Sequence, residues 1–333
     1  MEELGYAESD LNLNKILITF NIFCNVAMAP DNDLSVTHLP ENIVLQILGY
    51  LSVKDRCIAG RVCKQWRRIV KDNSLWRHVN LLEYRLDLPK MWKVFRAHFS
   101  PCLLTFRIKG FAHSDSIKRK KPSLSDAMLK ELSIRCPNLS LLELHDCNTD
   151  NLTFESLPTT LTSLLITYST WQPRWLKGHH GHLTKLESLD LSKSVRVDNL
   201  DIEDIAKLTN LKELSLSGCY RIDGSNFELI AKNLVRLDKL NISYTGVDEL
   251  AIHHISRHMK CLQELYISHC PNINDSSLTL VATGLSKLRI IDVTHCEEVT
   301  ITGLETLSTR RQLKIITCVN DVTLSDFRQK LSK

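Results

Sequence analysis

The sequence lacks the motifs that mark common catalytic and nucleotide-binding sites. It contains neither the phosphate-binding pattern G-x-x-x-x-G-K nor the nucleophile pattern G-x-S-x-G, and no paired catalytic constellation stands out. The net charge is only +4 over 333 residues, which gives no strong case for a nucleic-acid partner. Hydrophobic residues make up 43% and charged residues 24%, as in folded globular proteins. We therefore expect a folded protein without catalytic activity, cofactor or nucleic-acid ligand.

The cysteines lack the spacing of a metal or disulfide framework. There are eleven of them, an odd number, and none form a C-x-x-C pair. Four, Cys147, Cys219, Cys270 and Cys296, recur at one position of a repeat described below. A thiol that serves as a small buried hydrophobic group suits a reducing compartment. We expect the protein to reside in the cytoplasm, the nucleus or both.

The apolar stretch near the N-terminus is too short to cross a membrane. Residues 16–29 are apolar apart from Thr19 and two asparagines, and 14 residues do not span a bilayer. The stretch ends in Ala27-Met28-Ala29, which is similar to a signal-peptide cleavage site, but acidic rather than basic residues precede it. It is open to two interpretations, a secretion signal or part of a loosely ordered tail. We expect residues 1–35 to form a poorly ordered tail and no part of the chain to enter a membrane.

The C-terminal two-thirds repeat the pattern L-x-x-L-x-L-x-x-C, with aliphatic and small polar variants. Successive copies begin 36, 22, 25, 25, 26, 25, 26 and 25 residues apart. Chance does not produce nine copies at this spacing. Their first residues are Leu103, Leu139, Leu161, Leu186, Leu211, Leu237, Leu262, Leu288 and Leu313.

The repeat predicts a solenoid. Alternating apolar residues at the fourth and sixth positions form a short strand with one buried face, and helical spacing follows in several units, as at Ile202, Ile205 and Ala206. Neither strand nor helix can bury its apolar side alone, so the units stack with a parallel sheet inside and helices outside. A small Cys, Ser or Thr at the ninth position fits where the chain turns inward. The units resemble the cysteine-type class of leucine-rich repeats, which implies an α/β solenoid.

The strand residues between the inward leucines face the concave side. They form a central row about 38 Å long at ~4.8 Å per strand, which suits a protein partner better than a small molecule. Its carboxylates beside Tyr266 suggest a partner of basic character, although exposed strand residues occur in every repeat protein. The row consists of Arg107, Glu143, Leu165, Asp190, Ser215, Asn241, Tyr266, Asp292 and Thr317.

The segment before the repeats predicts three short helices. Pro40 is placed to open the first, along which Ile43, Ile47 and Leu51 form an apolar stripe. Ser52 to Asp55 has the sequence of a capping box for a second helix, which Gly60 ends. Val62, Cys63, Trp66, Ile69 and Val70 have helical spacing on a third. So small a core usually needs a partner.

This segment resembles the F-box. The resemblance rests on L-P-E at 39–41, the I-x-x-x-I-L-x-x-L run from Ile43 to Leu51, V-C-x-x-W at 62–66 and L-W at 75–76. It implies a protein of the F-box and leucine-rich-repeat family, whose F-box binds the adaptor Skp1 and through it cullin-1 and a RING subunit. The net charge of +5 over residues 36–80 agrees with an acidic adaptor. By resemblance, the adaptor-binding residues are Leu39, Pro40, Glu41, Ile43, Ile47, Leu48 and Leu51.

Two groups of residues remain open to more than one interpretation. The histidines at 179, 180 and 182, and the pair at 254 and 258, could suggest a metal, but no Cys or carboxylate completes either set at ligand spacing, so we expect no metal site. The run from Lys118 to Lys121 resembles a nuclear-localisation signal, and also falls where a solvated loop is expected.

The sequence therefore predicts four parts. Residues 1–35 are the tail, 36–80 the small three-helix F-box, 81–102 a helical linker and 103–333 a solenoid of about nine repeats. The resemblance implies the substrate-recognition subunit of an SCF ubiquitin ligase, with the substrate protein held by the repeats. An interaction scaffold that binds Skp1 without delivering substrates is the alternative.

Overall fold

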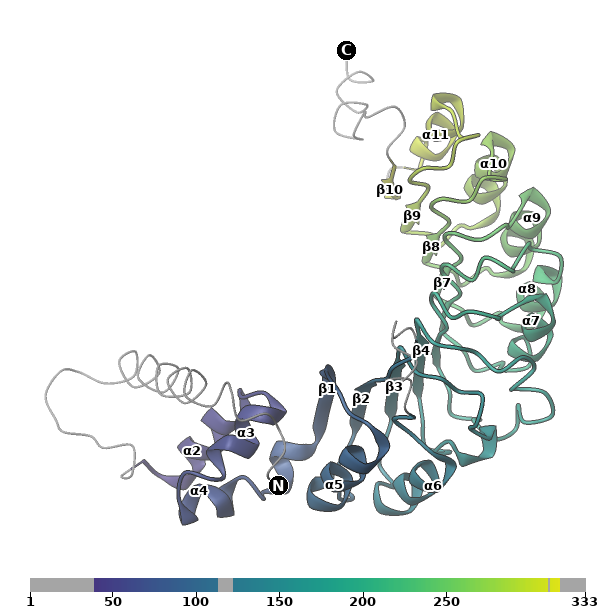
Figure 1. The fold of residues 1–333 in the computed structure, drawn as a ribbon. Coiled ribbons are helices and arrows are strands. Elements are labelled where there is room, and N and C mark those ends of the chain that lie inside the picture. The colour runs from purple at the N-terminus through teal and green to yellow at the C-terminus, as the bar shows by residue number, and fades with distance from the viewer. Residues whose placement is uncertain (1–38, 113–121, 311, 318–333) are drawn as a thin grey trace, which may run out of the picture.

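The structure, a computed structural model, describes residues 39–112, 122–310 and 312–317. The predicted tail and the run from Lys118 to Lys121 lie outside these residues. The described chain is a small helical segment followed by an open arc, with one sheet on its inner side and helices on its outer side (Figure 1). No helix in the described part combines the length and apolar character needed to cross a bilayer.

The helical segment consists of short helices that precede β1, and in the first repeats one helix precedes each of the next strands. In chain order they are α2 (Glu41–Gly49), α3 (Val53–Ala59), α4 (Lys64–Ile69), η2 (Asn73–Trp76), β1 (His78–Arg85), α5 (Leu88–His98), β2 (Thr105–Lys109), α6 (Asp126–Arg135), β3 (Leu141–His145), η4 (Phe154–Ser156) and β4 (Ser163–Thr167).

The later repeats alternate a three-residue strand with a helix. They comprise β5 (Ser188–Asp190), α7 (Asn199–Ile205), β6 (Glu213–Ser215), α8 (Phe227–Asn233), β7 (Lys239–Asn241), α9 (Glu249–His258), β8 (Glu264–Tyr266), α10 (Asp275–Gly284), β9 (Ile290–Asp292), α11 (Ile301–Ser308) and β10 (Lys314–Ile316).

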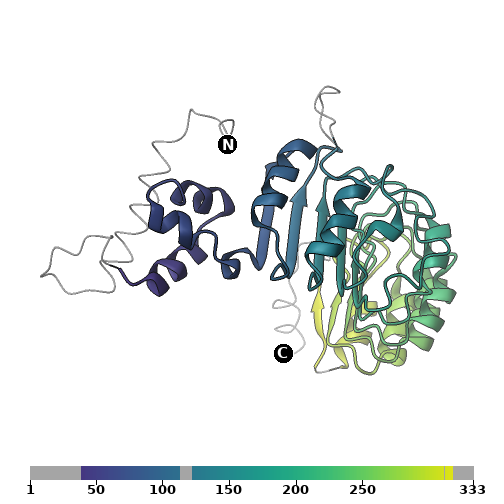
Figure 2. The ribbon, with the colours of Figure 1, turned by 90° about the horizontal axis from the view of Figure 1, so that it is seen from below.

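The ten strands form one sheet in sequence order, and every pair in it is parallel. Strands pack about 4.8 Å apart, whereas helices need about 8–10 Å. Because each repeat is wider on its helical side, the stack bends with the sheet inside, as both views show (Figures 1 and 2). The predicted α/β solenoid of leucine-rich repeats with an inner parallel sheet is confirmed.

The ninth position of the repeat joins neighbouring units in the core. Its hydroxyl or thiol donates to the carbonyl oxygen at the sixth position of the preceding repeat, for example Ser169 to Leu144 (3.1 Å), Cys219 to Leu191 (3.2 Å) and Cys296 to Ile267 (3.1 Å). Cys270 does the same toward Ile242 at 3.3 Å. Serine and cysteine are thus interchangeable here because both are small and carry a donor. Burial raises the pKa of the Cys219 and Cys296 thiols to about 12 each, which keeps them protonated.

The helical segment is held together by caps and by one arginine. Ser52 accepts a hydrogen bond from the backbone N–H of Asp55 at 3.2 Å and so begins α3, which ends before Gly60. The guanidinium of Arg56 donates to the carbonyl oxygens of Leu48 and Gly49, each at 3.0 Å, and to that of Leu75. The first two carbonyls lie at the C-terminal end of α2, where the helix leaves carbonyls without a full set of partners, and the third lies in η2. Arg56 therefore ties α3 to α2 and η2.

The solenoid begins earlier than the sequence predicted. The range 81–102 was expected to be a helical linker, but it contains most of β1, which pairs in parallel with β2, as well as helix α5. Trp76, Val79 and Leu81 are all 1% exposed and occupy the first, fourth and sixth positions of a repeat. Tryptophan and valine in place of leucine concealed this copy, so the sheet has ten strands rather than nine.

The last strand is displaced by one residue from the predicted register. Ile315 lies opposite the buried Ile291, and Ile316 lies opposite Asp292, so Ile316 takes the place in the central row that was assigned to Thr317. Thr317 is only 9% exposed. A shift of one residue turns every side chain of a strand to the other face. Adjacent isoleucines at 315 and 316 give no alternation, so the sequence could not fix the register.

The third helix is shorter than expected. Val62 and Cys63 were placed on its apolar side, but α4 begins at Lys64 and Cys63 is its N-cap, with the thiol accepting from the backbone N–H of Trp66 at 3.4 Å. Val62 is 54% exposed. The apolar spacing was extended one turn too far toward the N-terminus.

Candidate functional site

The first helix offers a partly apolar surface at the end of the molecule away from the sheet. Of the predicted adaptor-binding residues, Pro40 and Glu41 are exposed, and Leu39, Ile43 and Leu51 are half-buried. Glu41 forms an ion pair with Arg68 of α4. These five are accessible to a partner.

Two other members of the predicted set are not accessible. Ile47 is 4% and Leu48 0% exposed, and both belong to the core of the helical segment. The structure instead exposes Tyr50 to 79% and Val62 to 54% at the ends of α2 and of the turn before α4. Sequence reasoning missed Tyr50, and an aromatic directly after the apolar stripe was the available signal. The apolar surface therefore extends beyond the predicted residues.

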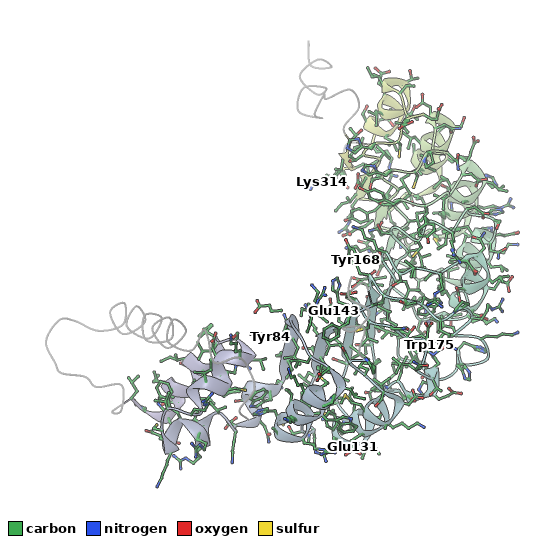
Figure 3. The ribbon with its side chains drawn as sticks, viewed as in Figure 1. Tyr84, Glu131, Glu143, Tyr168, Trp175 and Lys314 are labelled. Carbon is green, nitrogen blue, oxygen red and sulfur yellow. The ribbon has the colours of Figure 1, made fainter. Side chains whose placement is uncertain are left out.

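The predicted central row is present on the inner side of the arc. Arg107, Glu143, Leu165, Asp190, Ser215, Asn241, Tyr266 and Asp292 lie opposite one another on consecutive strands. All eight side chains are half-buried. Asn80 of β1 extends the row at one end, opposite Arg107, and Ile316 extends it at the other. Figure 3 shows Glu143 on this inner side and Glu131 and Trp175 on the outer parts of the arc.

Three polar members of the central row have a structural task. The side-chain oxygens of Asp190, Asn241 and Asp292 accept hydrogen bonds from the backbone N–H two residues later, at 2.8, 3.1 and 3.0 Å. Such bonds close a turn at the end of each strand. The side-chain oxygens of these residues thus already accept hydrogen bonds from the nearby backbone, which weakens the inference of a basic partner.

A second row follows the strands and was missed by sequence reasoning. The residue before the ninth position has a positive φ in seven successive repeats: Asp146, Tyr168, Lys193, Gly218, Tyr244, His269 and His295. Because this conformation turns the chain, the side chains stand at the edge of the concave face, where Tyr168 appears in Figure 3. The rings of Tyr244 and His269 stack 4.1 Å apart, and those of His269 and His295 lie 4.4 Å apart. The available signal was a polar residue directly before the ninth position in six of these seven repeats, with glycine in the other.

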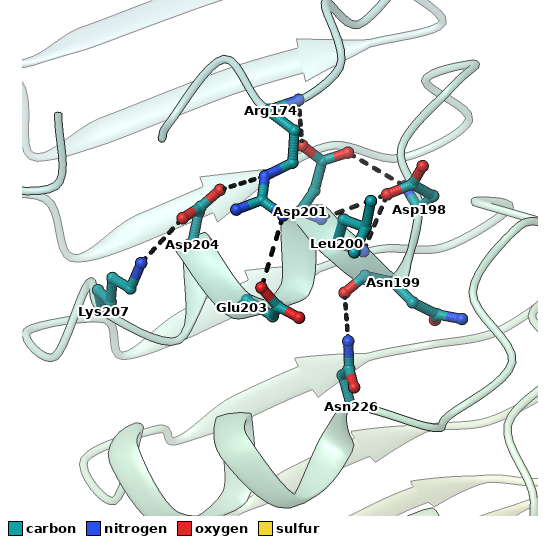
Figure 4. A network of polar contacts seen from close by, with 9 residues as sticks. All are labelled: Arg174, Asp198, Asn199, Leu200, Asp201, Glu203, Asp204, Lys207 and Asn226. Atoms are coloured by element: carbon teal, nitrogen blue, oxygen red, sulfur yellow. Dashed lines mark hydrogen bonds and ion pairs between the residues drawn. The ribbon is translucent and has the colours of Figure 1, made fainter. Parts of the chain in front are cut away.

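A buried charge network supports the outer side of the fourth and fifth repeats (Figure 4). The Nε of Arg174 lies 3.0 Å from Oδ2 of Asp204, whose side chain is 0% exposed. Lys207 approaches the other oxygen of Asp204 at 2.9 Å. The backbone N–H of Arg174 donates to Asp201 at 2.9 Å, and burial raises the pKa of that carboxyl. The network joins the loop after β4 to helix α7.

The histidines noted in the sequence serve other purposes. His179 Nδ1 lies 3.2 Å from Oε1 of Glu155, and the residue lines a hollow of about 370 Å³ next to η4. His182 Nε2 lies 2.7 Å from the carbonyl oxygen of Leu157. Among the described residues, no group of three or more His, Cys, Asp or Glu side chains could hold a metal ion.

The joint between the helical segment and the solenoid contains a histidine. His98, the last residue of α5, stacks on Trp76 with ring centroids 3.6 Å apart, and its Nε2 lies 3.9 Å from the thiol of Cys57. Burial lowers the pKa of His98 from 6.5 to about 4. The folded state therefore holds His98 in its neutral form.

We expect stability to decrease as the pH falls from 6.5 toward 4. In this window the unfolded state takes up a proton that folded His98 resists, so protonation favours unfolding. Denaturant unfolding at a series of pH values would measure the loss. His98→Phe, which can retain the stacking on Trp76, should flatten the curve between pH 6.5 and 4. An equally steep curve for this variant would assign the pH dependence to other groups.

Known proteins resemble the chain in both of its parts. Residues 36–82 match the family model described as F-box-like. The human F-box/LRR-repeat protein 12 is 37% identical over 142 residues, which are 43% of this chain and 43% of that protein. The mouse lysine-specific demethylase 2B is 25% identical over 277 residues, 81% of this chain and 17% of that protein. The chain thus matches less than half the length of either relative.

A solved structure of an internalin from Listeria monocytogenes superposes with a TM-score of 0.42 and 17% identity, covering 65% of this chain and 67% of that one. The family match, the relatives and the ten-stranded solenoid agree with one another. The chain is similar to proteins in which an F-box precedes leucine-rich repeats.

Proposed function

We propose that the chain is the substrate-recognition subunit of an SCF ubiquitin ligase and has no catalytic activity of its own. In this proposal the F-box binds Skp1, and Skp1 connects it to cullin-1 and the RING subunit. The repeats hold the protein to be ubiquitylated near the activated ubiquitin, so that the contribution to the reaction is proximity. The protein would act in the cytoplasm, the nucleus or both, where thiols such as those of the repeat stay reduced.

The observation that carries the proposal is the accessible apolar surface of the F-box. Pro40, Tyr50 and Val62 are exposed, and Leu39 and Ile43 are only half-buried. So small a helical unit would gain stability by covering this surface with another protein. The solenoid contacts the unit through Trp76, His98 and Tyr84, the last donating to Ser52 at 3.3 Å, and these contacts leave Pro40, Tyr50 and Val62 exposed. The F-box could therefore contact Skp1 and the solenoid at the same time.

The double variant Leu39→Ala, Pro40→Ala should weaken Skp1 binding by about tenfold or more, because truncated interface anchors typically cost over about 1 kcal/mol each. Binding of purified Skp1 to the full chain, measured by surface plasmon resonance, would test this. Tyr266→Ala, on the concave face far from the F-box, is the matched control and should bind Skp1 normally. Unchanged Skp1 affinity of a correctly folded double variant would contradict the proposal.

A second experiment separates a substrate receptor from a scaffold. A receptor co-purifies with cullin-1, and proteins captured by its repeats accumulate when it is depleted. For a scaffold, the same proteins would be captured but their amounts would not change. Accumulation that is abolished by re-expressing the wild type, and not by the Leu39→Ala, Pro40→Ala variant, would support the receptor.

A further inference from the structure

A continuous row of basic side chains crosses the concave side of the first five repeats. Arg85 at the end of β1 lies opposite Lys109 of β2, and Lys109 lies opposite His145 of β3. The ring of His145 is 5.2 Å from that of Tyr168, whose hydroxyl accepts a hydrogen bond from Lys193 Nζ at 2.7 Å. We call these five residues the basic row.

Two carboxylates near the basic row are covered by arginines. Asp146 pairs with Arg85 at 3.0 Å, and its side chain is 6% exposed whereas that of Arg85 is 43% exposed. Glu143 pairs with Arg107 at 3.4 Å, with exposures of 13% and 42%. In both pairs the carboxylate lies beneath and the guanidinium faces solvent. At each of these two pairs, the group presented to a partner is therefore the cation.

Lys109 and Lys193 add positive charge to the basic row. Within the described ranges, no carboxylate lies at ion-pair distance from Lys109 or Lys193. Burial, followed by the charge of Lys109, lowers the pKa of His145, while Asp146 and Glu143 act in the opposite sense. These groups are thus close enough to influence one another. An anion placed on the row would relieve the mutual repulsion of the cations.

The spread of the basic row indicates the shape of the anion. From β1 to β5 it extends over about 19 Å at ~4.8 Å per strand, which is much wider than a single phosphate group. An extended peptide advances about 3.3 Å per residue, so about six residues would lie along the row. Several separate carboxylates match separate cations better than one concentrated charge does.

We propose that the basic row binds an acidic peptide segment, about six residues long, of the protein that the repeats capture. The inference rests on the proposed function, because it names the chemistry of the substrate that the receptor would recognise. It places the contact with the substrate at the edge of the concave face, where cations face solvent. The carboxylates of the central row already form hydrogen bonds or ion pairs within the chain.

The inference can be tested on the full chain bound to Skp1 with a fluorescein-labelled octapeptide of alternating glutamate and glycine. Fluorescence polarisation should show binding that weakens as salt increases, since exposed charges are screened within about 8 Å at physiological ionic strength. The variant Lys109→Gln, Lys193→Gln should bind about tenfold more weakly, because each lysine loses an exposed ion pair. Neither lysine covers a buried carboxylate, so the variant should fold.

The variant Lys177→Gln, Lys287→Gln removes the same charge from exposed lysines elsewhere and should change the affinity less than about twofold. Equal affinities of the two variants would overturn the inference. So would an octapeptide with glutamine in place of each glutamate that binds as tightly as the original octapeptide. Tighter binding of an octapeptide with one phosphoserine and no glutamate would overturn it in favour of a phosphate site. Skp1 binding, measured on the same samples, reports separately on the proposed function.

Discussion

Replacing Leu265 by alanine is expected to destabilise the solenoid by about 2–5 kcal/mol. Leu265 occupies the fourth position of its repeat, in the middle of β8, is 0% exposed and lies between Leu240 and Ile291 of the adjacent strands. A truncated side chain here leaves a cavity that neither neighbour can fill without moving its own strand. Because each repeat is stabilised through its neighbours, the loss should affect the units on both sides.

Tyr266, the next residue, is the matched control for this prediction. Its side chain is half-buried, its hydroxyl donates to Glu264 at 2.9 Å, and Lys239 lies over its ring at 5.4 Å. Tyr266→Ala should therefore cost about 1 kcal/mol or less, as at most exposed positions. Urea unfolding followed by circular dichroism would compare the two variants. Similar losses for both would mean that burial does not distinguish the two faces of the strand.

The sequence predicted which strand residues face the core of the solenoid, because the two-residue period of a strand and the 25-residue spacing of the repeats act together. Residues such as Leu214, Leu240 and Leu265 had to face inward, since any other register would expose an unbroken row of leucines. The same reasoning lost accuracy wherever the apolar pattern was ambiguous. Trp76 concealed the first repeat, and the pair Ile315–Ile316 concealed the register of the last.

Side-chain hydrogen bonds were the part of the surface that the sequence could not show. Asp292 was expected to be a free carboxylate of the central row, yet its Oδ1 accepts from both the backbone N–H (3.0 Å) and the hydroxyl (2.6 Å) of Thr294. A pattern of alternating residues tells which side a carboxylate is on, but not whether a neighbouring donor already occupies it. The covered position of Asp146 beneath Arg85 joins residues 61 apart and was equally hidden.

The F-box shows the same limit. The motif placed Ile43, Ile47 and Leu51 on one stripe, and a stripe on a helix serves either a core or an interface. The packing of α2 against α4 and η2 divides the stripe, leaving Ile43 and Leu51 half-exposed and burying Ile47. Such a division depends on where other helices lie in space, which the spacing of apolar residues along one helix does not contain.

Replacing Arg174 by alanine is expected to destabilise the protein by about 3 kcal/mol, because it removes one of the two cations that neutralise the buried carboxylate of Asp204. Lys207 remains at 2.9 Å but is itself 46% exposed, so it offsets only part of the lost attraction. Guanidinium chloride unfolding is unsuitable for a charge network, because that salt screens it, and urea unfolding would measure the loss. Arg174 has a positive φ of 59°, and because arginine and alanine both carry a Cβ atom, the cost of this backbone conformation should be similar in wild type and variant.

Two further variants show whether the buried charge is the cause. Glu203→Gln removes the outer partner of Arg174, 3.5 Å away and 39% exposed, and should cost less than about 1 kcal/mol. The double variant Arg174→Ala, Asp204→Asn should be more stable than Arg174→Ala alone, because no unpaired charge is left in the interior. If the double variant is as unstable as the sum of the losses for Arg174→Ala and Asp204→Asn, then the Arg174 side chain stabilises the loop by packing rather than by neutralising Asp204, since the backbone bond to Asp201 is kept in every variant.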